Sequence, residues 1–342
     1  MRALRFAAFG DRDVLEVAEV DAPAPGPREV AVRVRAAGVN RLDLQIREGS
    51  AGFPIPLPFI GGMEAVGEVA ALGSEVEGWG VGERVMRDVT DSCGRCRHCR
   101  SGCEWRCESH ALTLNSVSGG FGEVLVCDAR RLIRLPAEID DATAAAIQMS
   151  YGTAWQMLFA RAGLQAGERV LISSVGSALG SAALDIAKLA GAFVIGTASS
   201  EEKLARARAR GLDVGIEHSA VDVATAVRDA TGGEGVDVAF EHVGGDAFAA
   251  ALASLAMDGR LVTCGWHGGG TVELDLMSLI RERRQIVGSV NRTRDDLHRC
   301  IELVAAGRLS PAIAASFPLE QARDAVGLIE SRAAFGKVVL EL

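Results

Sequence analysis

Aromatic residues, lysines and long apolar runs are scarce in this sequence, and the lack of long apolar runs excludes two kinds of segment. Aromatic residues make up 5% of the 342 residues, Tyr151 is the single tyrosine, and three lysines stand among 36 basic residues. No apolar run approaches the roughly 18 residues of a membrane-spanning helix, and residues 1–10 lack the apolar core of a signal peptide. We therefore expect a soluble, cytoplasmic protein with no membrane partner.

The charge balance is acidic, with 45 acidic residues against 36 basic ones and a formal net charge of −9. Nucleic acids and anionic membranes are bound through a basic face, so we expect neither as a partner and expect a small-molecule substrate instead. Hydrophobic residues make up 49% of the chain, which suffices for a large core, and the length is typical of two domains.

Five of the eight cysteines fall close together, at positions 93, 96, 99, 103 and 107. A short disulfide-rich secreted protein spreads its cysteines along the chain, whereas one dense cluster is typical of a metal site. Cys93, Cys96, Cys99 and Cys107 have the spacing C-x2-C-x2-C-x7-C and can supply the four thiolates of a tetrahedral zinc ion. Four protein ligands leave no open position, so the sequence favours one structural Zn²⁺.

Two other interpretations of the cysteine cluster stay open. Cys93, Cys96, Cys99 and Cys103 have the spacing of a bacterial ferredoxin motif. However, Glu104 stands where that motif has proline, and no second cysteine run is present. The remaining possibility is a loop that holds no metal.

The first 150 residues are rich in β-strand signals, and the chain after Thr153 alternates strands with helices. Alternating apolar residues over 30–34, with repeated prolines and glycines, indicate a twisted or barrel-like β-region. Later strands are predicted at 169–174, 192–197, 236–240, 260–264, 285–289 and 337–342, and helices at 153–161, 201–210 and 294–306. The alternation predicts an α/β fold with a doubly wound parallel sheet.

The predicted strand that ends at Ser174 is followed by a glycine-containing turn and a helix. A dinucleotide pyrophosphate needs a tight turn, a close backbone approach and a helix N-terminus at this place. The predicted cofactor-binding residues of the turn are Gly176, Ser177, Ala178 and Leu179. Ser174 and Ala178 stand where the motif G-x-G-x-x-G has glycine, so an ordinary turn without a ligand is the alternative.

Ala198 occupies the position, at the end of the next strand, where NAD-dependent enzymes place an acidic residue for the ribose hydroxyls. Without that carboxylate a 2′-phosphate is not repelled, and Ser199, Ser200 and Lys203 can bind it. The sequence therefore favours NADPH over NADH, although residues 201–202 add negative charge nearby.

Taken together, these segments resemble the medium-chain dehydrogenase/reductase superfamily, which includes zinc alcohol dehydrogenases and zeta-crystallin-like quinone oxidoreductases. The other matching segments are AGVNRLD (37–43), GGMEAVG (61–67), GGFGE (119–123), TAW (153–155) and GKVV (336–339). The resemblance implies a GroES-like β-rich catalytic domain over 1–150 and 289–342, with a zinc-binding lobe at about 91–108. It also implies a Rossmann dinucleotide-binding domain over 151–288, and a homodimer that pairs through an edge strand around 285–290.

The sequence departs from the zinc alcohol dehydrogenases of this family at the catalytic metal. The positions of the catalytic ligands hold Asn40, Met63 and Met149, whose side chains cannot replace thiolate and imidazole. Leu42 stands where the family has its proton-relay hydroxyl. The resemblance therefore points to the zinc-free, quinone oxidoreductase-like branch, with Glu64 left as a structural acid that an arginine would pair with.

Asn40 and Tyr151 are the predicted catalytic residues. The Asn40 amide would donate to the substrate carbonyl, and Tyr151 would donate to the developing enolate or hydroquinone; the alternatives are a loop-holding role for Asn40 and a packing role for Tyr151. By resemblance, Arg41 contacts the pyrophosphate and Thr153 lies on the nicotinamide side, whereas His242 is expected to be structural. Further predicted cofactor-binding residues are Val243, Cys264, Gly265, Asn291 and Lys337.

The loss of the catalytic metal constrains the reaction. Oxidation of an alcohol needs a Lewis acid or a strong base, whereas quinones and α,β-unsaturated carbonyls accept hydride when hydrogen-bond donors stabilise the resulting oxyanion. We therefore expect an NADPH-dependent reductase of such an acceptor or of an iminium compound. The alternatives are a zinc alcohol dehydrogenase with unusual ligands and a nucleotide-binding protein that has lost catalysis.

Overall fold

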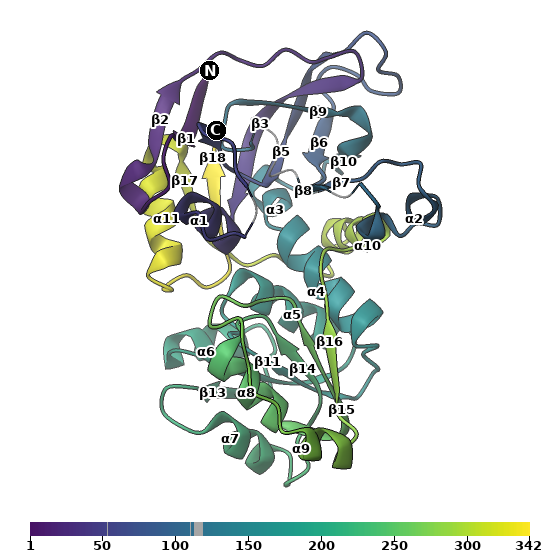
Figure 1. Ribbon diagram of the computed structural model, residues 1–342, viewed down its shortest axis with the longest axis vertical. Coiled ribbons are helices and arrows are strands. Elements are labelled where there is room, and N and C mark those ends of the chain that lie inside the picture. The colour runs from purple at the N-terminus through teal and green to yellow at the C-terminus, as the bar shows by residue number, and fades with distance from the viewer. Residues whose placement is uncertain (53, 110, 113–118) are drawn as a thin grey trace. The chain divides into compact units, whose positions relative to one another are not determined.

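The computed structural model describes residues 1–52, 54–109, 111–112 and 119–342, and the chain divides into two compact units. The first unit comprises Met1–Met149, Ile301–Ala306 and Ile313–Leu342, and the second comprises Ser150–Cys300 and Gly307–Ala312. The prediction assigns 289–342 to the first unit, whereas the structure places 289–300 and 307–312 in the second, so helix α10 (Arg294–Ala305) contributes residues to both units. Both termini belong to the first unit (Figure 1).

The first unit is built mainly from antiparallel strands. Its largest sheet has the order β10-β6-β5-β3-β18-β17, with β9 also paired to β3, and two small sheets have the orders β2-β1-β4 and β7-β8. The strands are β1 (Arg2–Phe6), β2 (Glu16–Glu19), β3 (Glu29–Val39), β4 (Phe59–Ile60), β5 (Glu64–Leu72), β6 (Arg84–Arg87), β7 (Thr90–Asp91), β8 (Ala111–Leu112), β9 (Val124–Asp128), β10 (Leu132–Arg134), β17 (Ile313–Pro318) and β18 (Lys337–Glu341). The helices are α1 (Arg41–Glu48), α2 (Arg97–Arg100), α3 (Asp141–Ala145) and α11 (Ala322–Glu330).

Strand β3 organises this unit because it pairs with three other strands. Val30, Val32 and Val34 are buried in one apolar cluster, whereas Arg33 and Arg35 are exposed. This alternation follows from the period of two residues in a strand. At its carboxyl end β3 pairs with β5 on one side and β18 on the other, so residues from three strands meet there.

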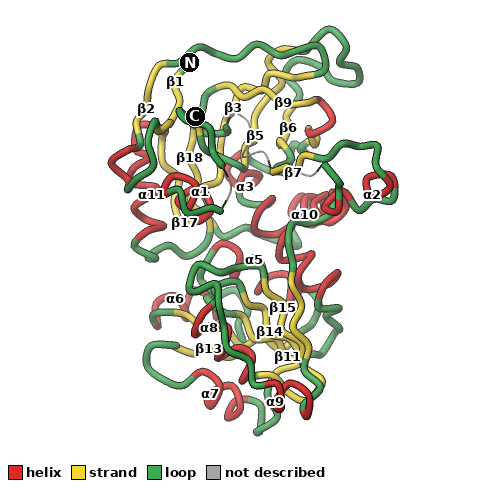
Figure 2. Tube along the Cα trace, in the orientation of Figure 1, coloured by secondary structure: helices red, strands yellow, loops and turns green. Residues whose placement is uncertain are grey.

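The second unit contains one six-stranded sheet with the order β13-β12-β11-β14-β15-β16, and all of its pairings are parallel. The strands are β11 (Arg169–Ile172), β12 (Phe193–Ala198), β13 (Val214–Glu217), β14 (Val236–Glu241), β15 (Leu255–Thr263) and β16 (Gln285–Gly288). The helices of this unit are α4 (Thr153–Trp155), α5 (Ala178–Leu189), α6 (Glu201–Arg208), α7 (Val223–Ala230), α8 (Gly245–Ala253) and α9 (Leu276–Arg281). Helices and strands alternate along the chain (Figure 2), so the predicted doubly wound sheet is confirmed.

The central strands of this sheet are buried nearly throughout. Val170, Val194 and Val238, on three neighbouring strands, are all fully buried, as expected for a parallel sheet that helices cover. The predicted regular helix over 153–161 is only partly present, because π-helical turns at Gln148–Gly152 and Gln156–Arg161 flank α4. None of the helices within the described residues is long and apolar enough to span a bilayer.

Candidate functional site

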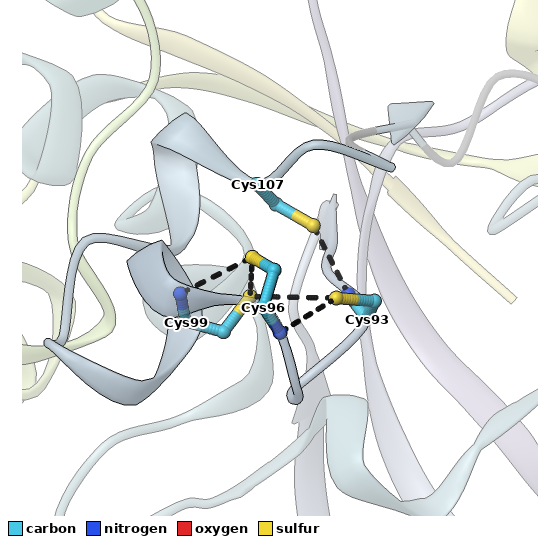
Figure 3. A group of neighbouring side chains, drawn as sticks. All are labelled: Cys93, Cys96, Cys99 and Cys107. Atoms are coloured by element: carbon cyan, nitrogen blue, oxygen red, sulfur yellow. Dashed lines mark hydrogen bonds between the residues drawn. The ribbon is translucent and has the colours of Figure 1, made fainter.

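Four cysteine thiols gather in the lobe that follows β7. Cys93, Cys96, Cys99 and Cys107 place their Sγ atoms within 4.8 Å of one another (Figure 3). Cys96 caps α2, where its sulfur accepts a hydrogen bond from the Cys99 amide. The amides of Cys93 and Cys96 donate to the sulfurs of Cys107 and Cys93, respectively. Hydrogen bonds of this kind stabilise thiolates.

The sulfur positions fit a tetrahedral zinc ion. Zinc–sulfur bonds of about 2.3 Å place the ligand sulfurs roughly 3.8 Å apart, and the Cys93–Cys99 and Cys96–Cys99 sulfur separations are 3.9 and 3.5 Å. The Cys103 sulfur lies outside this group, 3.9 Å from the Ser101 carbonyl oxygen. The structure therefore brings together the zinc set named from the sequence, with Cys107, and not the ferredoxin-like set.

Glu64 and Lys337 form a buried ion pair in the first unit. They open strands β5 and β18, which flank β3, and their side chains are 1% and 2% exposed. The Lys337 ammonium contacts Glu64 Oε2 and also donates to Asn40 Oδ1 at 2.7 Å, while Glu64 Oε1 accepts from the Met149 amide at 2.6 Å. The predicted arginine partner of Glu64 is therefore wrong, because the register of three strands brings Lys337 there instead.

Gly38 makes room for this ion pair. It lies opposite Glu64 in the β3–β5 register. A Cβ atom at this position would lie 2.5 Å from Glu64 Oε2 and 2.6 Å from both Lys337 Cε and the Ala145 carbonyl oxygen. A close-packed interior has no space to absorb contacts this short, so the approach of the three strands requires glycine here.

The Asn40 side chain is engaged with the same group. Its Nδ2 atom donates to Glu64 Oε2 at 3.0 Å and to the Gly38 carbonyl oxygen at 3.3 Å, and its Oδ1 accepts from Lys337. An amide nitrogen has two hydrogens, so both have protein acceptors. Donation to a substrate carbonyl would require one of these hydrogen bonds to be exchanged, and that role of Asn40 stays a prediction.

Asp43 is a buried carboxyl next to this group. Its Oδ2 accepts from the Asn40 amide at 2.8 Å and its Oδ1 from the Gly62 amide at 3.3 Å. Burial raises the pKa of Asp43 to about 6, although these hydrogen bonds and the charge of Lys337 act in the opposite direction. Met63 is buried in the apolar core of the same unit.

Tyr151 lies in the second unit and is buried there. Its hydroxyl donates to Asp185, which also accepts hydrogen bonds from Arg210. Burial, followed by the charge of Asp185, raises the pKa of Tyr151 far above its ordinary value. A hydroxyl committed to a buried carboxylate is a poor proton donor to a substrate. This geometry favours the packing role, and the catalytic role of Tyr151 stays a prediction.

The turn between β11 and α5 has the features that a pyrophosphate needs. Ser174 adopts a left-handed conformation, with φ of 50°, at the place where the motif has its first glycine. A Cβ atom on Gly180 would lie 2.3 Å from the Ser174 carbonyl oxygen, so helix and turn approach closely. Ser177 is the N-cap of α5, whose free N-terminal amides attract anions. The predicted residues Gly176, Ser177, Ala178 and Leu179 all lie in this turn or at the start of α5.

Other predicted cofactor residues follow the carboxyl ends of neighbouring strands in the same sheet. Val243 lies two residues after β14, Cys264 and Gly265 directly follow β15, and Asn291 follows β16 with φ of 56°. In parallel sheets ligands bind at this edge. The turn after β14 is shaped by Glu241, which accepts hydrogen bonds from the Val243 and Gly244 amides and the Thr263 hydroxyl.

Comparison with known proteins identifies the family. The descriptions "Alcohol dehydrogenase GroES-like domain" and "Zinc-binding dehydrogenase" match residues 26–137 and 178–306. A crystal structure of an NAD-dependent alcohol dehydrogenase is 37% identical, covers 100% of both chains and has a TM-score of 0.95. The acryloyl-coenzyme A reductase of Metallosphaera sedula is 30% identical, with 97% of each chain covered. The quinone oxidoreductase of Homo sapiens is 27% identical over 100% of this chain and 98% of that protein.

The chain belongs to the medium-chain dehydrogenase/reductase superfamily. The predicted family and the predicted fold class, a GroES-like domain with a Rossmann-type parallel sheet, are confirmed. The chain is therefore an NAD(P)H-dependent oxidoreductase of this superfamily.

The residues predicted to select the cofactor of this dehydrogenase/reductase lie at the end of β12 and the start of α6. Ala198 is the last residue of β12 and is buried, Ser199 is exposed, and Ser200 caps α6 by accepting from the Lys203 amide. Glu201 forms an ion pair with Arg208, further along α6. The positive charge of the arginine partly offsets the negative charge of Glu201 at the helix N-terminus.

Three predicted residues lie elsewhere in this dehydrogenase/reductase fold. Arg41 opens α1 and Thr153 opens α4. The Lys337 ammonium is occupied by Glu64 and Asn40, so its contact with a cofactor stays a prediction.

Two contacts in this dehydrogenase/reductase were not predicted from the sequence. One is the Glu64–Lys337 ion pair, and the other is the contact of 3.0 Å between Ser177 Oγ and His242 Nε2. Each had a signal in the sequence. Lys337 is one of three lysines and begins a strand of apolar residues, and His242 directly follows a buried strand.

Proposed function

We propose that the chain is an NADPH-dependent reductase that transfers hydride to an activated acceptor without a catalytic zinc. The acceptor is a quinone, an α,β-unsaturated carbonyl or an iminium compound. One observation carries the proposal. By the resemblance of the sequence, Asn40, Met63 and Met149 stand at the catalytic-zinc positions of the family, and in the structure the carboxylate beside them, Glu64, is paired with the Lys337 ammonium.

The charges of this group determine which acceptor is suitable. Amide and thioether groups bind zinc poorly, the Glu64–Lys337 ion pair has no net charge, and both oxygens of the neighbouring Asp43 carboxyl already accept hydrogen bonds from backbone amides. Among the described residues of this group, an alcohol would then find neither a Lewis acid nor a free base. A conjugated acceptor needs only donors near the oxygen that becomes negative. Similarity to an acryloyl-coenzyme A reductase and a quinone oxidoreductase supports such an acceptor, and similarity to an alcohol dehydrogenase favours the alternative.

The proposed cofactor fits the residues of the second unit. Bound NADPH would supply the hydride. The amides of Ala178 and Leu179 would bind its pyrophosphate, while Ser199, Ser200 and Lys203 would bind its 2′-phosphate. The absence of a side chain at Gly180 allows α5 to pack closely against the Ser174 backbone, which is the helix–turn packing that a dinucleotide site requires.

We also propose that Cys93, Cys96, Cys99 and Cys107 hold one structural Zn²⁺. The sulfur separations match those of a tetrahedral site. With four protein ligands the ion would have no open position, so its role would be to hold the lobe in place and not to polarise a substrate.

We further propose a homodimer formed through β16. This strand lies at the edge of its sheet and pairs with β15 alone among the described strands. Exposed apolar residues of the same region include Leu276, Met277, Ile280 and Val290, which are 56–69% exposed. An open strand edge with apolar neighbours favours pairing with a second copy. Light scattering should give twice the chain mass of 35.8 kDa, and Val290→Lys should shift the mass toward the monomer.

Two measurements on one preparation test the enzymatic proposal. NADPH oxidation should be observed with members of a panel of quinones, enones, enoyl thioesters and iminium compounds, and elemental analysis should find one zinc per chain. Two zinc ions per chain together with NAD⁺-dependent alcohol oxidation would establish the alcohol dehydrogenase alternative. Tight cofactor binding without turnover of any acceptor would instead favour a protein that has lost catalysis.

A matched pair of variants tests the choice of cofactor. Ser199→Asp places a carboxylate at an exposed position beside the proposed 2′-phosphate and should weaken NADPH binding about tenfold or more relative to NADH. Ser199→Asn has nearly the same shape without the charge and should leave the ratio of the two affinities close to that of the unmodified protein. If Ser199→Asp changes the ratio of NADPH to NADH affinity no more than Ser199→Asn does, the result would contradict a 2′-phosphate site at Ser199.

A further inference from the structure

His242 and Ser177 contact each other beside the β11–α5 turn. His242 directly follows β14, and its Nε2 atom lies 3.0 Å from Ser177 Oγ. Ser177 is the N-cap of α5, and its Oγ accepts a hydrogen bond from the Gly180 amide at 2.8 Å. The histidine therefore contacts the atom that caps the helix.

The second ring nitrogen of His242, Nδ1, is buried and has no hydrogen-bond partner among the residues that the structure describes. Burial, with a smaller effect of His267, lowers the pKa of His242 to about 3. The ring is thus neutral near pH 7 and carries one hydrogen, on Nδ1 or on Nε2. A buried N–H without an acceptor is rare in folded proteins, so the hydrogen belongs on Nε2.

This tautomer fixes the direction of the Ser177 hydroxyl. His242 donates from Nε2 to Ser177 Oγ, and the same oxygen also accepts from the Gly180 amide. The hydrogen of the serine must therefore point away from both groups. Ser177 is half-buried, so this hydrogen can reach a ligand beside the first amides of α5, those of Ala178 and Leu179.

The surroundings hold the imidazole in place. The Phe240 ring lies against it, with the two ring centres 5.8 Å apart. A Cβ atom on Gly265 would lie 1.9 Å from the His242 carbonyl oxygen, so the turn after β15 passes directly over the histidine backbone. A donor held in this way loses little freedom when it binds a ligand.

We propose that His242 is a positioning residue for cofactor binding, which directs the Ser177 hydroxyl as a hydrogen-bond donor to the pyrophosphate of a bound dinucleotide. A phosphate oxygen accepts hydrogen bonds and cannot donate them, so a hydroxyl oriented as a donor suits it. The inference rests on the proposed function, because it requires a dinucleotide at the β11–α5 turn.

Binding titrations with NADPH and with NADH test this inference without any turnover. Ser177→Ala and His242→Phe should each raise both dissociation constants about tenfold, and by the same factor for the two cofactors, which share the pyrophosphate. His242→Gln can present an amide N–H in place of Nε2–H and should restore most of the affinity. The control is Ser181→Ala, which removes a buried hydroxyl of the same helix that is bonded to the Ala178 carbonyl oxygen, and it should bind normally.

A double variant separates positioning from direct contact. Because His242 acts through Ser177, His242→Phe should weaken binding little further in a chain that already carries Ser177→Ala. Three results would each overturn the inference. The first is unchanged affinity in His242→Phe, and the second is an equal loss of affinity from His242→Phe in the unmodified protein and in Ser177→Ala. The third is no rescue by His242→Gln. If the unmodified protein binds neither cofactor, the proposed function fails together with it. Melting temperatures of the ligand-free variants identify any that are misfolded, and His242→Gln and Ser177→Ala keep the test decisive if His242→Phe does not fold.

Discussion

Removing the charge of Lys337 should destabilise the first unit strongly. Lys337→Met keeps most of the side-chain volume but leaves Glu64 buried without its cation, and both side chains are at most 2% exposed. Breaking a buried ion pair at one partner costs about 3–5 kcal/mol. For a unit of this size each kcal/mol lowers the melting temperature by roughly 2–4 °C, so calorimetry should show a loss of about 6–20 °C.

A second substitution should reverse most of this loss. Glu64→Gln in the Lys337→Met background removes the unpaired charge, and the new amide oxygen can still accept from the Met149 amide. Replacing both members of a buried ion pair is often close to neutral. The double variant should therefore melt well above Lys337→Met alone. The control is Lys188→Met. Lys188 forms an ion pair with Asp213 that is about 30% exposed, so the loss of this pair should cost less than about 1 kcal/mol.

Two results would refute this reasoning. If Lys337→Met melts within the range of Lys188→Met, the buried pair does not carry the energy assigned to it. If the double variant is less stable than Lys337→Met, the penalty does not come from an unpaired Glu64 carboxylate.

Cys107→Ser removes one of the four proposed zinc ligands and should lose most of the proposed zinc ion in elemental analysis, while Cys103→Ser should retain it. Asp43→Asn should remove a pH dependence from the free energy of unfolding. Burial raises the pKa of Asp43 to about 6, so the folded chain keeps a proton that the unfolded chain releases. The stability that this group contributes below about pH 4 is lost as the pH rises to about 6, by up to about 3 kcal/mol. Gly180→Ala should weaken NADPH binding about tenfold or more, because its Cβ would lie 2.3 Å from the Ser174 carbonyl oxygen.

Each of these predictions has a contrary outcome. Normal zinc content in Cys107→Ser would contradict the four-thiolate site. Denaturation profiles of Asp43→Asn that run parallel to those of the unmodified protein from about pH 4 to 6 would contradict the raised pKa. Unchanged NADPH affinity in a folded Gly180→Ala variant would show that the turn after β11 does not bind the cofactor.

Features set by local sequence were predictable. Strands β11, β12 and β14 are short apolar runs between turn signals, and the parallel sheet buries them almost throughout, so their positions follow from the sequence pattern. Strand β13 was not predicted, because it is short and only partly buried. Cys93, Cys96 and Cys99 are three residues apart, a spacing typical of metal sites, so the proximity of their sulfurs could be predicted. The β11–α5 turn was predictable for the same reason, since strand, turn and helix are consecutive.

Contacts between distant residues were not predictable, even where one of the two residues stood out in the sequence. Glu64 and Lys337 are far apart in the sequence, and only the register of β5, β3 and β18 brings them together. Tyr151 was predicted to be catalytic from its position in a family pattern, which does not tell where its hydroxyl points. In the structure that hydroxyl donates to Asp185. The boundary at 289–300 was missed because helix periodicity does not tell which unit a helix packs against.

The enclosure of Lys337 gives the chain an internal chemical reporter. Of its three lysines, Lys188 and Lys203 are half-buried and Lys337 is 1% exposed. An amine-selective acylating reagent should therefore modify Lys188 long before Lys337, whose nitrogen becomes reachable only when strand β18 separates from its neighbours. Mass spectrometry of the peptide that contains Lys337 would then time the opening of the first unit under native conditions, with no dye and no engineered label.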